Sequence, residues 1–325
     1  MIYLIYLILA IIVVLFSIKV ADYVELIDKK TNISGAFIGG VMLAAITSLP
    51  EFFTSLSAAL LFNNSELVLG NILGSNIFNL AALTSVLLIF MKGFANSNIS
   101  SKHYKTTIYG LILTGILFIP VYFSKDLNIF NISLVSVAIV VLYFSSLKFM
   151  ASDTNVETEK EKEKEDECKL TIKQIAVRFT IVSIGLVVSS IFITHVTEII
   201  ADKLNLAASL SGALFLGIAT SLPEVASIVA LAKRCKFDLV VGNIVGSNIF
   251  NLFIIAFIDI LYIGTSVYLT DSIQTKLLLL FVFISTILTI ILLLLKNLKK
   301  KSKIVYTLLA LAIIIVYVLY LILSL

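Results

Sequence analysis

Residues 70–80 read GNILGSNIFNL and residues 242–252 read GNIVGSNIFNL, so ten of eleven positions are identical. A second motif, TSLPE, also occurs twice, at residues 47–51 and 220–224. The copies lie 173 residues apart for the second motif and 172 for the first. The chain therefore contains an internal repeat. Its shared residues are largely polar and oxygen-bearing, which packing in lipid does not require, so we expect them to form a functional site.

The composition places this repeat in a membrane. Of the 325 residues, 60% are hydrophobic and 14% are charged, whereas soluble domains have roughly 45–50% apolar and about 25% charged residues. This balance argues against a soluble enzyme, a disordered regulator, a secreted disulfide scaffold and a nucleic-acid-binding protein. The sequence also contains no hydrolase, metalloprotease or phosphate-loop motif. We therefore expect no enzymatic activity and no cofactor.

Ten apolar segments are long enough to cross a bilayer as helices, which takes roughly 20 residues each. They span about 2–20, 34–62, 67–91, 107–123, 129–150, 173–200, 207–233, 238–262, 273–295 and 304–324. The two motif copies are five segments apart, and because five is odd, the second copy crosses in the opposite direction. The sequence thus predicts an all-α membrane protein with ten transmembrane helices arranged as two inverted-topology five-helix repeats.

The predicted halves meet at a charged segment. The first half covers 1–151 and holds its repeat at about 34–91, and the second covers 173–325 and holds its repeat at about 207–262. Residues 152–172 between them include a run of acidic residues and lysines, which cannot bury an apolar core. We interpret this segment as a solvated linker.

The positions of Lys and Arg predict the orientation. All but three of the 24 basic residues fall on the side of the linker, and the exceptions are Lys125, Lys203 and Lys276. Basic residues concentrate in cytoplasmic loops. We therefore expect a multi-pass protein of the cell membrane with a cytoplasmic linker and with both termini outside.

Glu51 and Glu224 are the acidic residues predicted to lie deep in the membrane. A carboxylate at mid-bilayer costs at least ~2.5–3.5 kcal/mol, and no Lys or Arg lies near the middle of any predicted span. The missing positive charge must therefore be a bound cation or a proton. Each glutamate follows a proline, Pro50 or Pro223. A proline inside a helix removes one backbone hydrogen bond, which predicts discontinuous helices with carbonyls turned toward a site.

Helical spacing brings further oxygen ligands to the same faces. Residues four apart lie on one side of a helix. The pairs with this spacing are Thr47 with Glu51, Thr220 with Glu224, Ser75 with Asn79, and Ser247 with Asn251. All of them offer oxygen and none offers thiolate or imidazole, so hard cations such as Ca²⁺ or Na⁺ fit. Mg²⁺ sheds its water reluctantly, and a cage built of protein atoms argues against it.

Duplicated in inverted halves, these motifs resemble the α-repeats of the sodium/calcium exchangers, in the calcium/cation antiporter superfamily. The resemblance implies that Glu51 and Glu224 bind calcium. It implies that Na⁺ and Ca²⁺ occupy overlapping sites, and that the first and sixth helices slide against the remainder. The further ligands it implies are Thr47, Thr220, Ser48, Ser221, Ser75, Ser247 and Asn79, with the backbone carbonyls of Ala44 and Gly217 for sodium.

The chain departs from the family pattern at two places. Many members have Asp at the position of Asn251, so this chain has two site carboxylates, enough to neutralise one Ca²⁺. Ile46 and Ala219 stand where the family often has glycine before the threonine.

The sequence therefore predicts an antiporter with Ca²⁺ and Na⁺ as substrates, embedded in the bilayer and acting by alternating access, for which a monomer suffices. Proton- or potassium-coupled antiport on the same scaffold stays open as an alternative. A non-transporting cation-binding membrane protein and a channel also stay open.

Overall fold

The computed structural model of the chain is described over most of its length. The described residues are 2–31, 33, 35–61, 63–123, 128–129, 132–151, 170–203, 217–262, 266–298 and 302–324. They are almost entirely helical, apart from two-residue strands that pair antiparallel, β1 (Asn128–Ile129) and β2 (Ile132–Ser133). The predicted linker, 152–172, lies largely outside the described residues.

The helices fall into the two predicted halves of the chain. In the first half they are α1 (Ile2–Lys30), α2 (Gly35–Phe37), the π-helix η1 (Ile38–Leu43), α3 (Ala44–Thr47), α4 (Leu49–Leu60), α5 (Ser65–Ile89), α6 (Met91–Asn96), α7 (Ser101–Phe123) and α8 (Leu134–Ala151). In the second half they are α9 (Ile172–Lys203), α11 (Leu222–Lys233), α12 (Phe237–Leu261), α13 (Ile273–Asn297) and α14 (Lys303–Ser324). Residues 217–220 are also helical.

Eight of the described helices are long and apolar enough to cross a membrane, and the bent pair formed by 35–47 and 49–60 makes a ninth. The remaining predicted span, 207–233, begins outside the described residues, which resume at 217. The structure therefore shows an all-helical protein with eight or nine such helices, and the ten-helix arrangement stays a prediction. The first helix continues ten residues past its predicted end at about 20, because charged residues of its last turns pair with one another and with Arg234.

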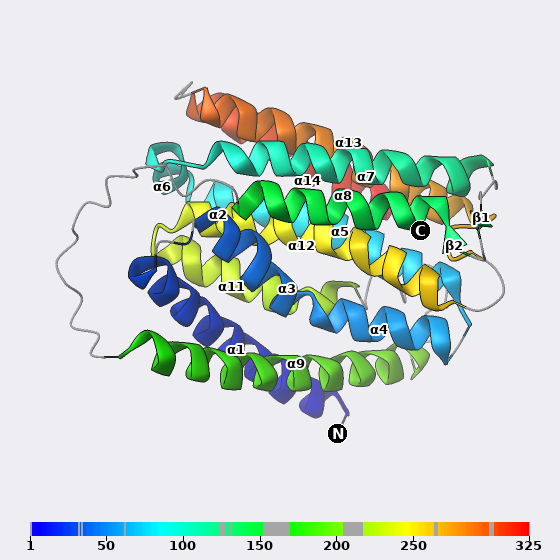
Figure 1. Ribbon diagram of the computed structural model, residues 1–325, viewed down its shortest axis with the longest axis horizontal. Helices are drawn as coiled ribbons and strands as arrows, with labels where there is room; N and C mark the ends of the chain where they lie inside the picture. The colour runs from blue at the N-terminus through cyan, green and yellow to red at the C-terminus, as the bar shows by residue number, and fades with distance from the viewer. Residues whose placement is uncertain are drawn as a thin grey trace.

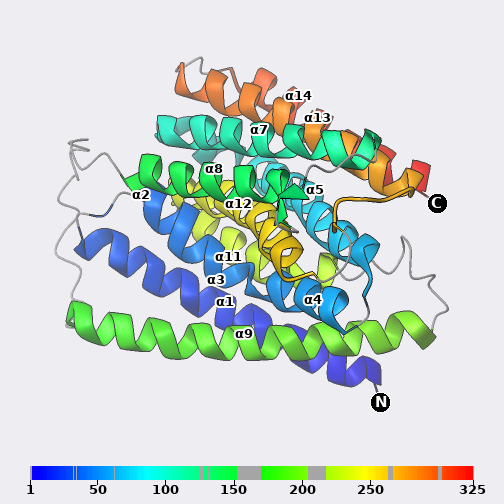
Figure 2. The same ribbon diagram turned by 45° about the vertical axis from the view of Figure 1, so that its right-hand side comes forward.

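The helices that carry the long motif lie at the centre of the bundle (Figure 1). In the most apolar stretches of α5 and α12, 72% and 67% of the residues are buried, against 22% in α1 and 17% in α14. Helices α1 and α9 pack side by side along one flank, and α13 and α14 lie along the opposite flank (Figures 1 and 2). The peripheral helices thus shield the polar residues of α5 and α12 from lipid.

Small residues permit a close contact between η1 and α12. Gly39 and Gly40 of η1 pack against Gly242 and Gly246 of α12, and a methyl group at Gly246 would meet the Gly40 carbonyl directly. Glycines permit such backbone approach between membrane helices. This contact seats the broken helix of the first TSLPE motif against the long motif of the second half.

We expect Gly246→Ala to destabilise the protein by about 1–3 kcal/mol, because the added methyl collides with backbone that cannot rotate away. A lowered thermal midpoint in detergent, followed by circular dichroism, measures the effect. Gly115→Ala is the matched control, since its methyl would lie 3.6 Å from a Phe283 ring carbon, an ordinary contact. Equal midpoints for the two variants would contradict the close packing.

Candidate cation-binding site

Two helix breaks place the glutamates. The helix that contains η1 and α3 ends at Ser48 (φ −91°, ψ 6°), and α4 restarts at a 43° angle with Pro50 and Glu51 in its first turn. The second copy repeats this geometry at Ser221 (φ −85°, ψ 5°), after which α11 carries Glu224 in its first turn. The chain thus leaves the helix just before each Leu-Pro-Glu, as the prolines predict.

Both glutamates are fully buried, and each accepts a hydrogen bond from the serine of the other motif copy. The Ser221 hydroxyl donates to Glu51 Oε1 at 3.2 Å, and the Ser48 hydroxyl donates to Glu224 Oε1 at 3.0 Å. Ser247 adds a longer bond to Glu224 Oε1, 3.4 Å. The breaks therefore bring the two copies of TSLPE into direct contact.

Four of the buried oxygens without a hydrogen-bond partner belong to predicted site residues. They are Glu51 Oε2, Glu224 Oε2, Asn79 Oδ1 and Asn251 Oδ1. Over the described ranges, no Lys or Arg forms an ion pair with either glutamate. A buried carboxylate without a charged partner is costly. All four atoms are acceptors, so together they meet the requirement of a cation.

The hydroxyl groups of the predicted ligands also pair across the motif copies. Thr47 Oγ1 lies 3.5 Å from Ser247 Oγ, and Thr220 Oγ1 lies 3.4 Å from Ser75 Oγ. Each pair joins a residue beside a helix break to a residue of the long motif on α5 or α12. Helical spacing predicts which residues share a face of one helix, but it does not predict these contacts between helices.

The predicted carbonyl ligands remain in the helical bond pattern. The Ala44 carbonyl accepts the Ser48 amide at 3.0 Å, and the Gly217 carbonyl accepts the Ser221 amide at 3.0 Å. The prolines therefore do not turn these two carbonyls away from the helix, contrary to the sequence-based prediction. Each carbonyl also accepts the hydroxyl of the motif threonine, Thr47 to Ala44 at 3.3 Å and Thr220 to Gly217 at 3.1 Å. The assignment of Ala44 and Gly217 as sodium ligands stays a prediction.

All twelve predicted site residues are buried. They are Ala44, Thr47, Ser48, Glu51, Ser75, Asn79, Gly217, Thr220, Ser221, Glu224, Ser247 and Asn251. Within the described part of the chain, no group of three or more His, Cys, Asp or Glu side chains forms a metal-binding cluster. The candidate site instead combines two carboxylates with amide and hydroxyl oxygens, the chemistry of hard cations.

Sequence reasoning missed the asparagines that brace this site. The Asn71 amide donates to Ser55 Oγ at 2.8 Å and to the Glu51 carbonyl at 3.3 Å. In the second half, the Asn243 amide donates to Ser227 Oγ at 2.8 Å. The sequence contained a signal for them, because Asn71 and Asn243 occupy the same position in the two copies of the long motif.

A sequence profile of the sodium/calcium exchanger protein family matches residues 1–151 and 175–325. The chain belongs to this family. The family is one of membrane transporters and not of enzymes, which agrees with the absence of catalytic motifs in the sequence.

Family members with curated sequences resemble the chain over most of its length. The sodium/calcium exchanger MaX1 of Methanosarcina acetivorans is 24% identical over 83% of this chain and 89% of its own. The inner membrane protein YrbG of Escherichia coli is 25% identical over 71% of this chain and 70% of its own. Structures of the sodium-calcium exchanger NCX_Mj share the fold: one soaked with Na⁺ and Sr²⁺ has a TM-score of 0.71 at 21% identity, covering 99% of this chain and 98% of the other.

We expect Asn71→Leu and Asn243→Leu each to lower the free energy of unfolding by about 1–3 kcal/mol, because each removes a buried hydrogen bond to a serine of the neighbouring helix. The thermal midpoint in detergent measures this, and Asn96→Leu at an exposed position is the control. If either variant unfolds at the wild-type temperature, that asparagine does not brace the site.

Proposed function

We propose that the chain is a secondary active transporter that exchanges Ca²⁺ for Na⁺ across the cell membrane by alternating access. The observation that carries this proposal is the pair of fully buried glutamates, each with one oxygen that has no partner and with only hydroxyl donors on the other. A bound cation supplies the positive charge that the described residues around these glutamates do not.

Charge and ligand number support calcium as one substrate. Two ionised glutamates balance the charge of one Ca²⁺. Ca²⁺ takes about 6–8 oxygen ligands, and the carboxylates, the Asn79 and Asn251 amide oxygens and threonine oxygens can supply them. Na⁺ prefers the same hard ligands. We therefore propose that the two ions compete for overlapping positions, with Ala44 and Gly217 carbonyls among the sodium ligands.

The proposal includes the ten-helix inverted repeat as the architecture that permits alternating access. Its support is the reciprocity of the hydrogen bonds: Ser48 with Glu224 has a counterpart in Ser221 with Glu51, and Asn71 with Ser55 has one in Asn243 with Ser227. Reciprocal contacts of this kind are expected when two halves are related by a two-fold axis in the membrane plane.

The flanking pair α1 and α9 is the proposed moving part. These two helices pack mainly against each other, and beyond that α1 contacts η1 and α11 while α9 contacts α3 and α4. They therefore lie beside both helix breaks. Sliding of the pair along the bundle would open the site to one side of the membrane and then to the other. We propose that both termini lie outside the cell and that one monomer is sufficient for transport.

We expect proteoliposomes loaded with Na⁺ to take up Ca²⁺ when they are diluted into sodium-free buffer. Glu51→Gln and Glu224→Gln should each reduce this uptake about a hundredfold or more, because removing one charge that pairs with a buried ion costs about 3–5 kcal/mol. The control is Asp271→Asn, a carboxylate at an exposed position, which should transport like wild type.

Each other outcome selects a different function. Ca²⁺ uptake that is independent of the sodium gradient and is driven by a pH jump would indicate proton coupling. Ca²⁺ uptake that requires potassium would indicate potassium coupling. Calcium binding without flux would indicate a non-transporting protein, and flux without any counter-ion would indicate a channel. Undiminished uptake by both glutamine variants would overturn the assignment of the site.

A further inference from the structure

We propose that Asn76 and Asn248 are positioning residues that fix the side-chain amides of Asn251 and Asn79, so that each presents its oxygen and not its N–H groups to the cation. The inference rests on the proposed function, since it concerns the ligands of the same site. It goes beyond that function because neither Asn76 nor Asn248 is among the proposed ligands.

The two positioning asparagines clamp each other across the centre of the bundle. The Asn76 side-chain nitrogen donates to the Asn248 backbone carbonyl at 3.1 Å, and the Asn248 side-chain nitrogen donates to the Asn76 backbone carbonyl at 3.0 Å. One residue is on α5 and the other is on α12. Because each nitrogen is held by a backbone acceptor, neither amide can rotate by half a turn without losing a bond between helices.

This clamp dictates the orientation of the next pair. With their nitrogens engaged, Asn76 and Asn248 offer Oδ1 as an acceptor. Asn76 Oδ1 receives the Asn251 amide at 2.9 Å, and Asn248 Oδ1 receives the Asn79 amide at 3.2 Å. A primary amide carries its donors and its acceptor on different atoms of one plane. Asn79 and Asn251 must therefore turn their nitrogens toward the clamp, and their oxygens are left buried without a partner.

A reversed amide at either ligand position would be penalised twice. It would set oxygen against oxygen at the clamp, and it would direct N–H groups at a cation. The clamp thus fixes the amide orientation of Asn79 and Asn251, so that each presents its oxygen as an acceptor. It also matches amides and not acids at these positions, because an aspartate at 251 has no proton to donate to Asn76 Oδ1.

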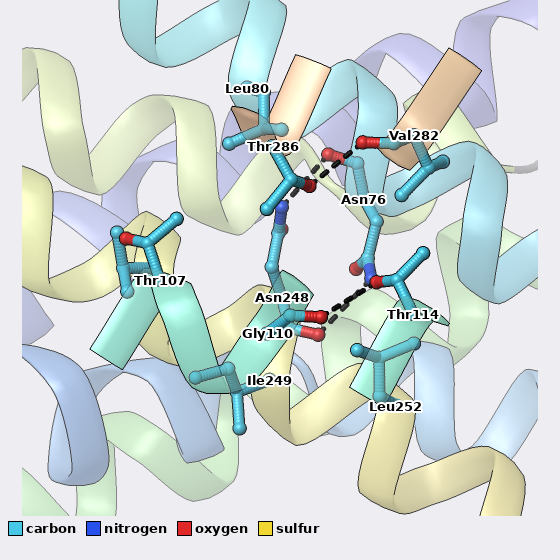
Figure 3. A pocket seen from close by; sticks show the side chains of 11 residues that line it. Asn76, Leu80, Thr107, Gly110, Thr114, Asn248, Ile249, Leu252, Val282 and Thr286 are labelled. Atoms are coloured by element: carbon cyan, nitrogen blue, oxygen red, sulfur yellow. Dashed lines mark hydrogen bonds between the residues drawn. The ribbon is translucent and has the colours of Figure 1, made fainter. Parts of the chain in front are cut away.

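A small cavity adjoins Asn76 and Asn248, next to their side-chain amide groups (Figure 3). It measures about 20 Å³ and is lined in part by Asn76, Asn248, Thr107, Thr114 and Thr286. Each of these threonine hydroxyls donates to a carbonyl of its own helix, at 2.7–2.8 Å, which leaves lone pairs for the cavity. A cavity of this size has room for one water, and a water placed there would accept an N–H from the clamp.

Crosswise double-mutant cycles test the assignment. The structure pairs Asn76 with Asn251 and Asn248 with Asn79, although Asn76 and Asn79 are neighbours on one helix. An aspartate needs no orientation, because its two oxygens are equivalent. An aspartate at 251 also has no N–H bond to Asn76 that could be lost. The weakening of binding by Asn76→Leu should therefore disappear in an Asn251→Asp background and persist in an Asn79→Asp background. The effect of Asn248→Leu should show the opposite pattern.

The readout is the apparent Ca²⁺ affinity, taken from the calcium-dependent rise of the thermal midpoint in detergent. We expect Asn76→Leu to weaken binding about tenfold in the wild type and in Asn79→Asp, the loss of about one buried polar ligand, and by less than about twofold in Asn251→Asp. If the leucine variants do not fold, Asn76→Ser and Asn248→Ser carry the same cycles, since serine lacks the amide.

Equal losses in every background would show a merely structural role and overturn the proposal, as would coupling along the helix, between 76 and 79, in place of coupling across it. Wild-type affinity in both Asn76→Leu and Asn248→Leu would also overturn it. A wild-type protein whose midpoint does not respond to Ca²⁺ would instead fail the proposed function, so the two failures are distinguishable.

Discussion

Two carboxylates are buried together at the centre of an apolar bundle, and the side chains that donate to them in the described structure are hydroxyls. Hydroxyl groups can satisfy lone pairs, but they cannot neutralise charge. A buried carboxylate stays ionised when an opposite charge is present, and otherwise it is neutralised by a proton. The rest of the architecture serves this constraint: it brings Glu51 and Glu224 together, excludes basic residues, and surrounds them with oxygen.

In the described structure, the two helix breaks lie where other parts of the protein cover them. Both helix breaks, at Ser48 and Ser221, are fully buried, as backbone at membrane depth must be when it leaves the helix. The close approach of η1 to α12 at Gly246 seats one break against the long motif. The polar faces of α5 and α12 are then enclosed by the remaining helices, which explains why these two spans are the most buried of the eight long helices.

The duplicated motifs predict much of this site, and the reason is the inverted repeat. Identical polar residues at offsets of 173 and 172 identify Glu51, Glu224 and the residues around them without any knowledge of the fold, and Pro50 and Pro223 locate the breaks. What the sequence could not predict are the partners. Spacing along a helix fixes a shared face, whereas the bonds from Ser48 to Glu224 and from Asn251 to Asn76 depend on how helices far apart in the chain are packed. The π-helix η1 and the full length of α1 were missed for the same reason, since contacts with other helices stabilise both.

The most direct test of the central claim is a crystal structure of the protein soaked with Ca²⁺ or Sr²⁺, read by anomalous scattering. We predict one strong peak between Glu51 and Glu224, within about 2.3–2.6 Å of an oxygen from each for calcium. A peak bound elsewhere, or two carboxylates separated from each other or each paired with its own lysine or arginine, would contradict the account.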